Sequence, residues 1–371
     1  MKTLTPPDLG TERGSMEEAP HQAPAHSVPS VSIVIPCRNE VRFIGRCLDS
    51  IISDGYPLNR IEVLVADGMS TDGTREIVSS YAERFPFVHL LDNPRGITPC
   101  ALNIGIASAR GDIILRMDAH TSYEPGYITA CLDGLARFGA DNVSGLLRLV
   151  PAADRLIDRA VVRAWSHPFG GGRAPHRTVR GGEPRFVDLV PFFCCRRELV
   201  HAVAPFNERL LRHQDFDFLA RLKERGARCL LVPAAICNYY ARSDFKSFCK
   251  HGFRDGLWVF LALQHSNSVP FLPRHLVPLA FVVTLAMASI GATFSIGVAW
   301  GLGALLAIYG VVALISAAQV SHEEHDLRMI VIMPIMFAAR HITFGVGSLV
   351  GVARLALSRE FWSRASAHLR R

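Results

Sequence analysis

A stretch of 45 residues from Leu276 to Val320 contains no Asp, Glu, Lys or Arg. Because about 20 apolar residues suffice for one helix to cross a bilayer, this stretch is long enough for two crossings joined by a turn near Ser295 to Gly301. The alternative is a pair of buried core helices, although uncharged runs of this length are rare in soluble cores. The stretch therefore predicts two transmembrane helices.

A third apolar segment runs from Met329 to Leu357, but it carries Arg340, His341 and Arg354. Such a segment either spans with its charged residues facing other helices or lies re-entrant in the interface. Residues 276–357 are accordingly interpreted as the membrane region.

Basic residues flank this region on both sides, and cytoplasmic flanks are the ones enriched in Lys and Arg. They are Arg242, Lys246, Lys250, Arg254 and Arg274 before it, and Arg354, Arg359, Arg364, Arg370 and Arg371 at its end. An even number of crossings and a multi-pass protein of the cytoplasmic (inner) membrane are expected. The domain of residues 30–265 then faces the cytoplasm, as does the basic tail of residues 358–371.

The ends and the cysteines agree with this arrangement. Residues 1–29 are polar, lack the apolar core of a signal peptide and are expected to be disordered. The nine cysteines include no C-x-x-C pair, so reduced thiols are expected rather than disulfides or a zinc site.

Strand-like apolar runs alternate with helix-like segments between residues 31 and 120. The predicted strands are Val31–Ile35, Ile61–Ala66, Phe87–Leu91 and Gly111–Leu115, and a further strand is expected at 141–150. Alternation of this kind predicts an α/β fold with a doubly wound, mostly parallel sheet.

Polar loops follow three of these strands, at 36–40, 67–72 and 118–120. In an open α/β sheet, ligands bind at the carboxyl ends of the strands. Asp118 and His120 are two residues apart, so in an extended segment both side chains would point to one side and could share a divalent cation. The alternative is an exposed Asp-Ala-His loop without a ligand.

Several function classes lose their signatures. No G-x-G-x-x-G follows the first strand and no G-x-x-x-x-G-K-[ST] occurs, which argues against dinucleotide-binding dehydrogenases and P-loop NTPases. The net charge of +7 suits an anionic partner. Nucleic acid is not expected as that partner, because no Lys/Arg run interleaved with aromatic residues is present.

Residues 31–265 resemble a family 2 glycosyltransferase with the GT-A fold. The resemblance lies in VSIVIPCRNE at 31–40, DGMSTDGT at 67–74, and Gly111-Asp112 through Asp118-Ala119-His120. The Asp-Ala-His variant, residues 240–258 and HITFGVG at 341–347 look most like the succinoglycan-type exopolysaccharide glycosyltransferases.

This resemblance implies roles at the donor site. Pro36 and Glu40 would line the nucleotide pocket, Asp67 would accept a hydrogen bond from a uracil-type base, and Arg95 would approach the base or the diphosphate. Asp118 would face the ribose and a divalent cation, Mn²⁺ or Mg²⁺. His120 stands where the family more often has Asp, and it is interpreted as the second ligand of that cation.

The resemblance also implies a catalytic base. Where these enzymes have Glu-Asp before a helix, this chain has Gln214-Asp215, and Asp215 would take the proton of the acceptor hydroxyl. The structural alternative is that Asp215 caps a helix over 216–224. For Asp72 and Asp217 that capping role is the preferred interpretation.

Residues just before the membrane region are candidates for binding a diphosphate, of the leaving nucleotide or of a lipid-linked acceptor. With Gln214, they are Arg242, Lys250, Arg254 and Trp258. The alternative is an interfacial helix with basic residues and an aromatic anchor. The Gln-x-x-Arg-Trp motif of processive relatives is absent.

The resemblance implies an inverting, metal-dependent glycosyltransferase that moves a sugar from a nucleotide donor, expected to be a UDP-sugar, to a lipid-linked saccharide in surface-polysaccharide synthesis. The alternatives are transfer to a polyprenyl phosphate itself and a non-catalytic membrane subunit that binds nucleotide. A soluble nucleotidyltransferase would have no use for the segment from Leu276 to Val320.

Overall fold

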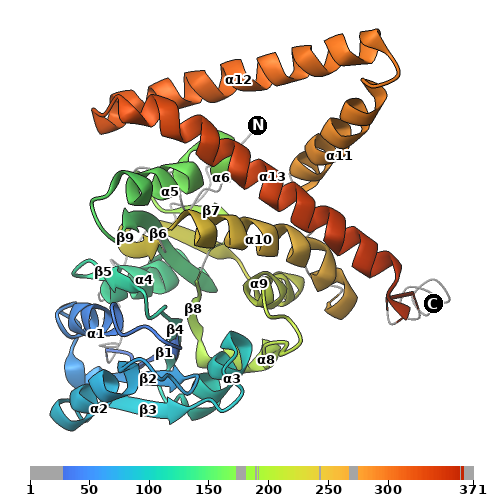
Figure 1. The fold of residues 1–371 in the computed structure, drawn as a ribbon. Coiled ribbons are helices and arrows are strands. Elements are labelled where there is room, and N and C mark those ends of the chain that lie inside the picture. The colour runs from blue at the N-terminus through green and yellow to red at the C-terminus, as the bar shows by residue number, and fades with distance from the viewer. Residues whose placement is uncertain are drawn as a thin grey trace, which may run out of the picture.

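The computed structural model describes residues 28–172, 181–188, 190, 192–241, 244–266, 275–359 and 361–362. Its centre is a nine-stranded mixed sheet in the order β3-β2-β1-β4-β8-β6-β9-β5, with β7 pairing to β9. Figure 1 shows this sheet in the lower part of the molecule and the C-terminal helices packed above it.

The first half of the sheet is parallel, as the sequence predicts. Its strands are β1 (Val31–Cys37), β2 (Ile61–Asp67), β3 (Val88–Asp92) and β4 (Ile113–Arg116). β1 pairs with β2 and with β4, and β2 pairs with β3. The carboxyl ends of these strands therefore meet at one edge.

Helices cover both faces of this parallel half. They are α1 (Ile44–Ile52), α2 (Thr74–Arg84) and α3 (Thr98–Ser108), with a 3-10 turn η1 (Leu58–Arg60) before β2. In α1, helical spacing puts Ile44, Cys47, Leu48 and Ile51 on one buried face. Separate apolar clusters form on the two sides of β1, because Ile33 and Ile35 belong to one and Val34 to the other.

The second half of the sheet is mixed in direction. Its strands are β5 (Thr121–Tyr123), β6 (Asn142–Pro151), β7 (Arg185–Val187), β8 (Cys194–Arg196) and β9 (Cys229–Ala241). The helices of this part are α4 (Tyr127–Arg137), α5 (Leu156–Ser166), α6 (Pro168–Gly171), α8 (Arg197–Val203) and α9 (Gln214–Glu224). β6 matches the further predicted strand, whereas β5, β7, β8 and the long strand β9 were not anticipated.

Among the described residues, β9 is followed by four long helices: α10 (Phe245–His265), α11 (Leu276–Gly291), α12 (Ile296–Glu324) and α13 (Arg328–Ala356). α13 lies along α10 (Figure 1). The two backbones approach so closely that a Cβ at Gly256 would overlap the carbonyl of Phe344, and one at Gly347 would overlap the carbonyl of Phe253. Small residues of this kind let helix backbones pack in direct contact.

The structure changes which apolar segments have the length of a membrane span. α12 and α13, with 29 residues each, are long and apolar enough to cross a membrane, whereas α11 has only 16 residues. At 1.5 Å per residue α11 is shorter than the roughly 30 Å hydrocarbon core. The first predicted span, which corresponds to α11, is thus too short. The third apolar segment, 329–357, whose topology the sequence left open, forms α13 and is long enough to span. The turn between α11 and α12 lies at 292–295 rather than at 295–301.

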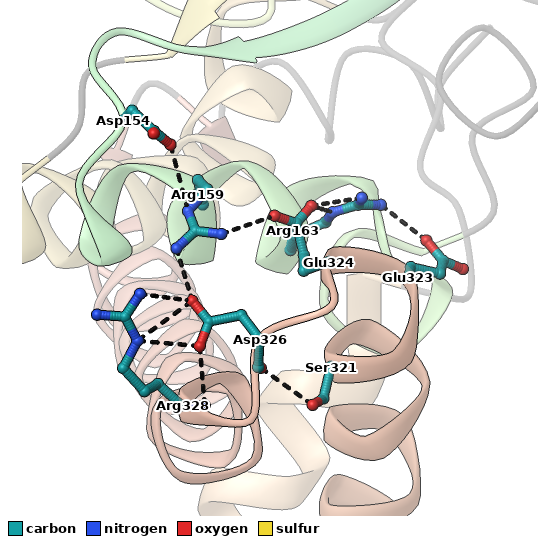
Figure 2. Close-up of polar contacts among 8 residues, drawn as sticks. All are labelled: Asp154, Arg159, Arg163, Ser321, Glu323, Glu324, Asp326 and Arg328. Atoms are coloured by element: carbon teal, nitrogen blue, oxygen red, sulfur yellow. Dashed lines mark hydrogen bonds and ion pairs between the residues drawn. The ribbon is translucent and has the colours of Figure 1, made fainter.

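The turn between α12 and α13 is held against α5 by ion pairs, which Figure 2 shows in close-up. Arg159 donates to Asp326 at 2.6 Å, and Arg163 contacts Glu324 at 2.5 Å and Glu323 at 2.8 Å. These contacts place one end of both long helices on the sheet domain.

All nine cysteines are free, as predicted, and eight of them are buried. The predicted N-terminal tail up to residue 27 and most of the basic C-terminal tail lie outside the described residues. Their predicted disorder and charge role stay predictions.

Candidate active site

A cavity of about 990 Å³ opens at the carboxyl edge of β1 and β4. One side, here called the strand wall, is formed by Pro36, Arg38, Glu40, Asp118 and His120. The facing side, here called the helix wall, is formed by Arg212, Gln214, Asp215, Lys250 and Arg254. The cavity therefore combines most of the predicted donor and acceptor residues in one place.

Asp118 and His120 do reach the same cavity, although not through an extended segment. β4 ends at Arg116 and β5 begins at Thr121, so the two side chains project from the short turn between them. Two hydrogen bonds fix the turn. The Asp118 backbone N–H donates to the Tyr123 hydroxyl at 3.1 Å, and the Thr121 hydroxyl donates to the Asp118 carbonyl at 2.6 Å.

Arg116 joins the two walls. This arginine is 4% exposed, and its guanidinium donates to Asp118 at 3.1 Å and to Asp215, which belongs to α9. A buried cation needs paired anions, and here two carboxylates from segments far apart in sequence supply them. Asp118 and Asp215 are thereby held by the two terminal nitrogens of one guanidinium.

The pKa of Asp215 is raised above its ordinary value. Burial is the largest cause and the nearby charge of Asp118 adds to it, while Arg116 acts in the opposite direction. A carboxylate with a raised pKa is a stronger base toward an incoming hydroxyl. Asp215 is not a helix cap, because His213 occupies that position and Asp215 lies inside the first turn.

His120 is held by an acidic and aromatic surrounding. Its Nδ1 lies 3.3 Å from the Glu40 carboxylate, and its ring meets the Tyr239 ring edge-on at 4.6 Å. Burial alone would lower the pKa of His120, but Tyr239, Glu40 and Asp118 raise it to about 10. The Glu40 and Asp118 carboxylates therefore favour the protonated form of the imidazole when no cation is bound.

The strand wall fits a divalent cation shared with a substrate. A metal-ligating histidine commonly donates its other ring nitrogen to a carboxylate, which is the relation of His120 to Glu40. Among the described residues no cluster of three or more His, Cys, Asp or Glu could hold an ion alone. Asp118 and His120 would supply two ligands, and substrate phosphates the remainder.

The structure does not bring Asp67 onto the cavity wall. Its carboxylate is fully buried and accepts hydrogen bonds from the backbone and hydroxyl of Ser70 and from Arg75. Asp67 thus orders the loop after β2, so the predicted contact with a base has no support in this geometry. Asp72 accepts from the Thr74 backbone at 3.1 Å, which agrees with its predicted capping role, although Gly73 is the cap residue itself.

Arg95 and Trp258 also lie away from the cavity lining. Arg95 is exposed and pairs with Glu208, and Trp258 packs with Leu210 and Ala262. Arg242 lies outside the described residues. Asp217 is structural as expected, but not as a cap: it pairs with Arg221 within α9 and accepts a hydrogen bond from Ser266, which follows α10.

Gln214, Lys250 and Arg254 line the helix wall as predicted candidates. Gln214 is 8% exposed, and its Oε1 has no hydrogen-bond partner in the described part of the chain. Lys250 and Arg254 are exposed on α10. The helix wall therefore offers cationic groups and one unsatisfied acceptor to a ligand.

Two site residues escaped the sequence interpretation. Arg116 lies two residues before Asp118, and the sequence interpretation gave it no role. A charged residue at the end of an apolar strand nevertheless indicates a buried ion pair. Arg212 lines the cavity from the segment before α9. Only the packing of α9 and α10 around it reveals this.

Comparison with known proteins agrees with the fold and gives the family. The family model described as glycosyl transferase family 2 matches residues 32–187, which contain the strand wall. A relative that is 30% identical aligns with this chain over most of the relative's own length. The chain therefore belongs to this family of glycosyltransferases. Its mixed α/β sheet is of the GT-A type.

That relative is the succinoglycan biosynthesis protein ExoA of Rhizobium meliloti (strain 1021). It is 30% identical over 317 residues, which cover 78% of this chain and 91% of the relative. A second relative is a dolichyl N-acetyl-alpha-D-glucosaminyl phosphate 3-beta-D-2,3-diacetamido-2,3-dideoxy-beta-D-glucuronosyltransferase of Methanococcus voltae. It is 24% identical, over 62% of this chain and 74% of the relative.

Among solved structures, a mannosyltransferase of Pyrobaculum calidifontis in complex with GDP-Man and Mn²⁺ superposes with a TM-score of 0.58. The superposition covers 87% of this chain and 88% of the other, at 21% identity. This similarity supports the fold.

Proposed function

We propose that this chain transfers one sugar from a nucleotide donor to a hydroxyl of a lipid-linked saccharide, with inversion, during exopolysaccharide synthesis. The observation that carries the proposal is the Arg116 bridge, which holds Asp118 and Asp215 on one guanidinium in one cavity. The ExoA similarity supports a role in exopolysaccharide synthesis. The relative that acts on a dolichyl-linked sugar supports a lipid-linked acceptor.

In this reaction the acceptor oxygen attacks the anomeric carbon while its proton passes to Asp215. The bond between that carbon and the nucleotide phosphate breaks, and the diphosphate leaves with the electron pair. The raised pKa of Asp215 favours its role as the proton acceptor. Gln214 and the cationic side chains of Lys250 and Arg254 are assigned to the acceptor side of the cavity.

The donor is assigned to the strand wall, with a UDP-linked sugar as the expected class. Pro36 and Glu40 border it, and Asp118 and His120 are the residues that would hold Mn²⁺ or Mg²⁺. Such a cation offsets the negative charge that grows on the leaving diphosphate. His120 would have to lose its proton to serve as a ligand, so the affinity for the cation is expected to rise with pH.

The membrane is assigned to the apolar surfaces of α12 and α13, with the sheet domain on the cytoplasmic side. The ion pairs of Figure 2 keep the α12–α13 turn on that domain, and α13 packs along α10. The membrane would therefore meet the exposed apolar side chains of these helices, such as Ile308, Ile315 and Val331. Basic residues near the apolar segments support the cytoplasmic orientation.

A thermal-unfolding screen of the full-length protein in detergent tests which nucleotide sugar is the donor. UDP-, GDP- and dTDP-linked sugars are screened for protection against thermal unfolding, with and without Mn²⁺, because a ligand that binds only the folded form raises its stability. Protection by a UDP-sugar that depends on Mn²⁺ is expected. Protection by a GDP-sugar alone would contradict the expected donor class.

Labelled donor is then incubated separately with polyprenyl phosphate and with lipid-linked oligosaccharide. Labelling of the oligosaccharide is expected. Labelling of the bare lipid phosphate alone would replace the proposed acceptor with the simpler one. No labelling by wild-type protein, despite nucleotide protection, would favour a non-catalytic nucleotide-binding subunit.

A further inference from the structure

Asp255 of α10 lies behind the helix wall and contacts two arginines and a histidine from three parts of the chain. Its carboxylate accepts from Arg212 at 2.5 Å and from Arg340 of α13 at 3.1 Å, and it lies 3.4 Å from the His251 ring. Arg212 and His251 line the cavity, whereas Asp255 and Arg340 do not. Asp255 therefore connects α13 to groups that face the substrate.

The connection is electrostatically favourable. The side chain of Asp255 is 20% exposed, and a carboxylate so far removed from water requires paired cations. Burial alone would raise the pKa of Asp255, but His251, Arg340 and Arg212 lower it to about 2. The carboxylate is therefore ionised at neutral pH, and its two oxygens hold Arg212 and Arg340 at the same time.

Close helix packing restricts the position of Arg340. α13 is set against α10 by glycines, since a Cβ at Gly252 would overlap Thr343 and one at Gly256 would overlap the Phe344 carbonyl. Such direct backbone contact fixes the relative position of two helices. Arg340 thus approaches Asp255 from a rigid neighbour.

Arg212 connects this contact to Asp215, the proposed base. It precedes Asp215 by three residues, and His213 between them adopts a left-handed conformation with φ of 64° before α9 begins at Gln214. A short, sharply turned segment leaves Arg212 and the start of α9 few independent positions. Displacement of Arg212 is therefore expected to displace Asp215.

We propose that Asp255 is a positioning residue through which α13 fixes the segment from Arg212 to Asp215, so that the last apolar helix is a working part of the active site. The proposal rests on the proposed function only in its catalytic consequence. The mechanical link between α13 and α9 is independent of it.

Hydrogen exchange of the full-length protein in detergent tests the link without any substrate. Asp255→Asn and Arg340→Gln are each expected to speed exchange of the 210–217 amides by about 10-fold, since local opening is favoured when its anchoring contacts are lost. Arg340→Lys should restore the slow exchange. Arg354→Gln, on the exposed side of the same helix, is the matched control and should match wild type.

The double variant Asp255→Asn/Arg340→Gln should exchange no faster than Asp255→Asn alone, because both substitutions break one network. Additive effects, or faster exchange confined to α10 and α13 with 210–217 unchanged, would overturn the link.

Transfer kinetics test the catalytic consequence. Asp255→Asn and Arg340→Gln should lower kcat about 10-fold while the KM for the nucleotide sugar stays at the wild-type value, and Arg340→Lys should recover kcat. An unchanged kcat together with faster exchange at 210–217 would overturn the positioning role. If wild-type protein transfers no sugar, the proposed function fails, and the exchange result still decides the link.

Discussion

The two walls of the cavity are built in different ways. The strand wall comes from loops that directly follow β1 and β4, two neighbouring parallel strands. The helix wall combines α9 and α10, and its positions depend on contacts that reach Arg340 of α13. Parallel strand ends are placed by the sheet itself, whereas the helix wall depends on side-chain contacts between remote segments. The helix wall should therefore be the more sensitive to changes outside the cavity.

The largest effect is expected at the residue of the helix wall that we assign to proton transfer. Asp215→Asn keeps the shape but removes the base, so kcat should fall by roughly 10²- to 10⁴-fold. Nucleotide protection against unfolding should remain, because the strand wall is intact. The exposed Asp133 of α4 provides the control as Asp133→Asn. Wild-type turnover by Asp215→Asn would remove the carboxylate from the mechanism.

Removing the bridge between the walls should cost both stability and activity. Arg116→Gln leaves Asp118 and Asp215 facing each other without their cation, and loss of one partner of a buried ion pair costs about 3 kcal/mol. Denaturant unfolding in detergent measures this free energy. The double variant Arg116→Gln/Asp118→Asn should recover part of it, because one unpaired charge is gone. Equal stability of both variants would argue against the bridge.

The contact between α10 and α13 gives a smaller effect. Gly256→Ala adds a methyl group where the Phe344 carbonyl already lies, and overpacking of this kind costs about 1–3 kcal/mol. Gly303→Ala in α12 is the matched control, since no atom lies within 4 Å of the added Cβ. Unfolding of both variants in the same detergent should separate them. Equal stabilities would mean that the helices separate readily.

The smallest effect is a change in pH dependence. Burial, reinforced by Arg212, lowers the pKa of His213 from 6.5 to about 4, although Asp255 acts in the opposite direction. Between these values the unfolded chain binds a proton that the folded chain does not, so stability falls as the pH is lowered from about 6.5 to about 4. His213→Asn, which tolerates the left-handed backbone, should flatten this fall. His89→Asn, at an exposed position, should not; a parallel pH series of melting curves compares them.

The sequence by itself determined the parallel half of the sheet and the loops that carry the strand wall. Apolar runs of strand length alternated with helical spacing, and chain order then required their carboxyl ends to meet at one edge. Asp118, His120, Pro36 and Glu40 could be assigned to one site for that reason.

Only the tertiary structure decided which charges meet. Arg116 and Asp215 are 99 residues apart, and Asp255 and Arg340 are 85 apart, so no local periodicity relates them. Local periodicity also does not show that the Asp67 carboxylate is bound by Ser70 and Arg75 rather than free for a ligand. Nor does it show where the turn after α11 lies, which sets the length of that helix. Periodicity records which face of an element is apolar, but an ion pair forms only where packing brings two remote side chains within reach.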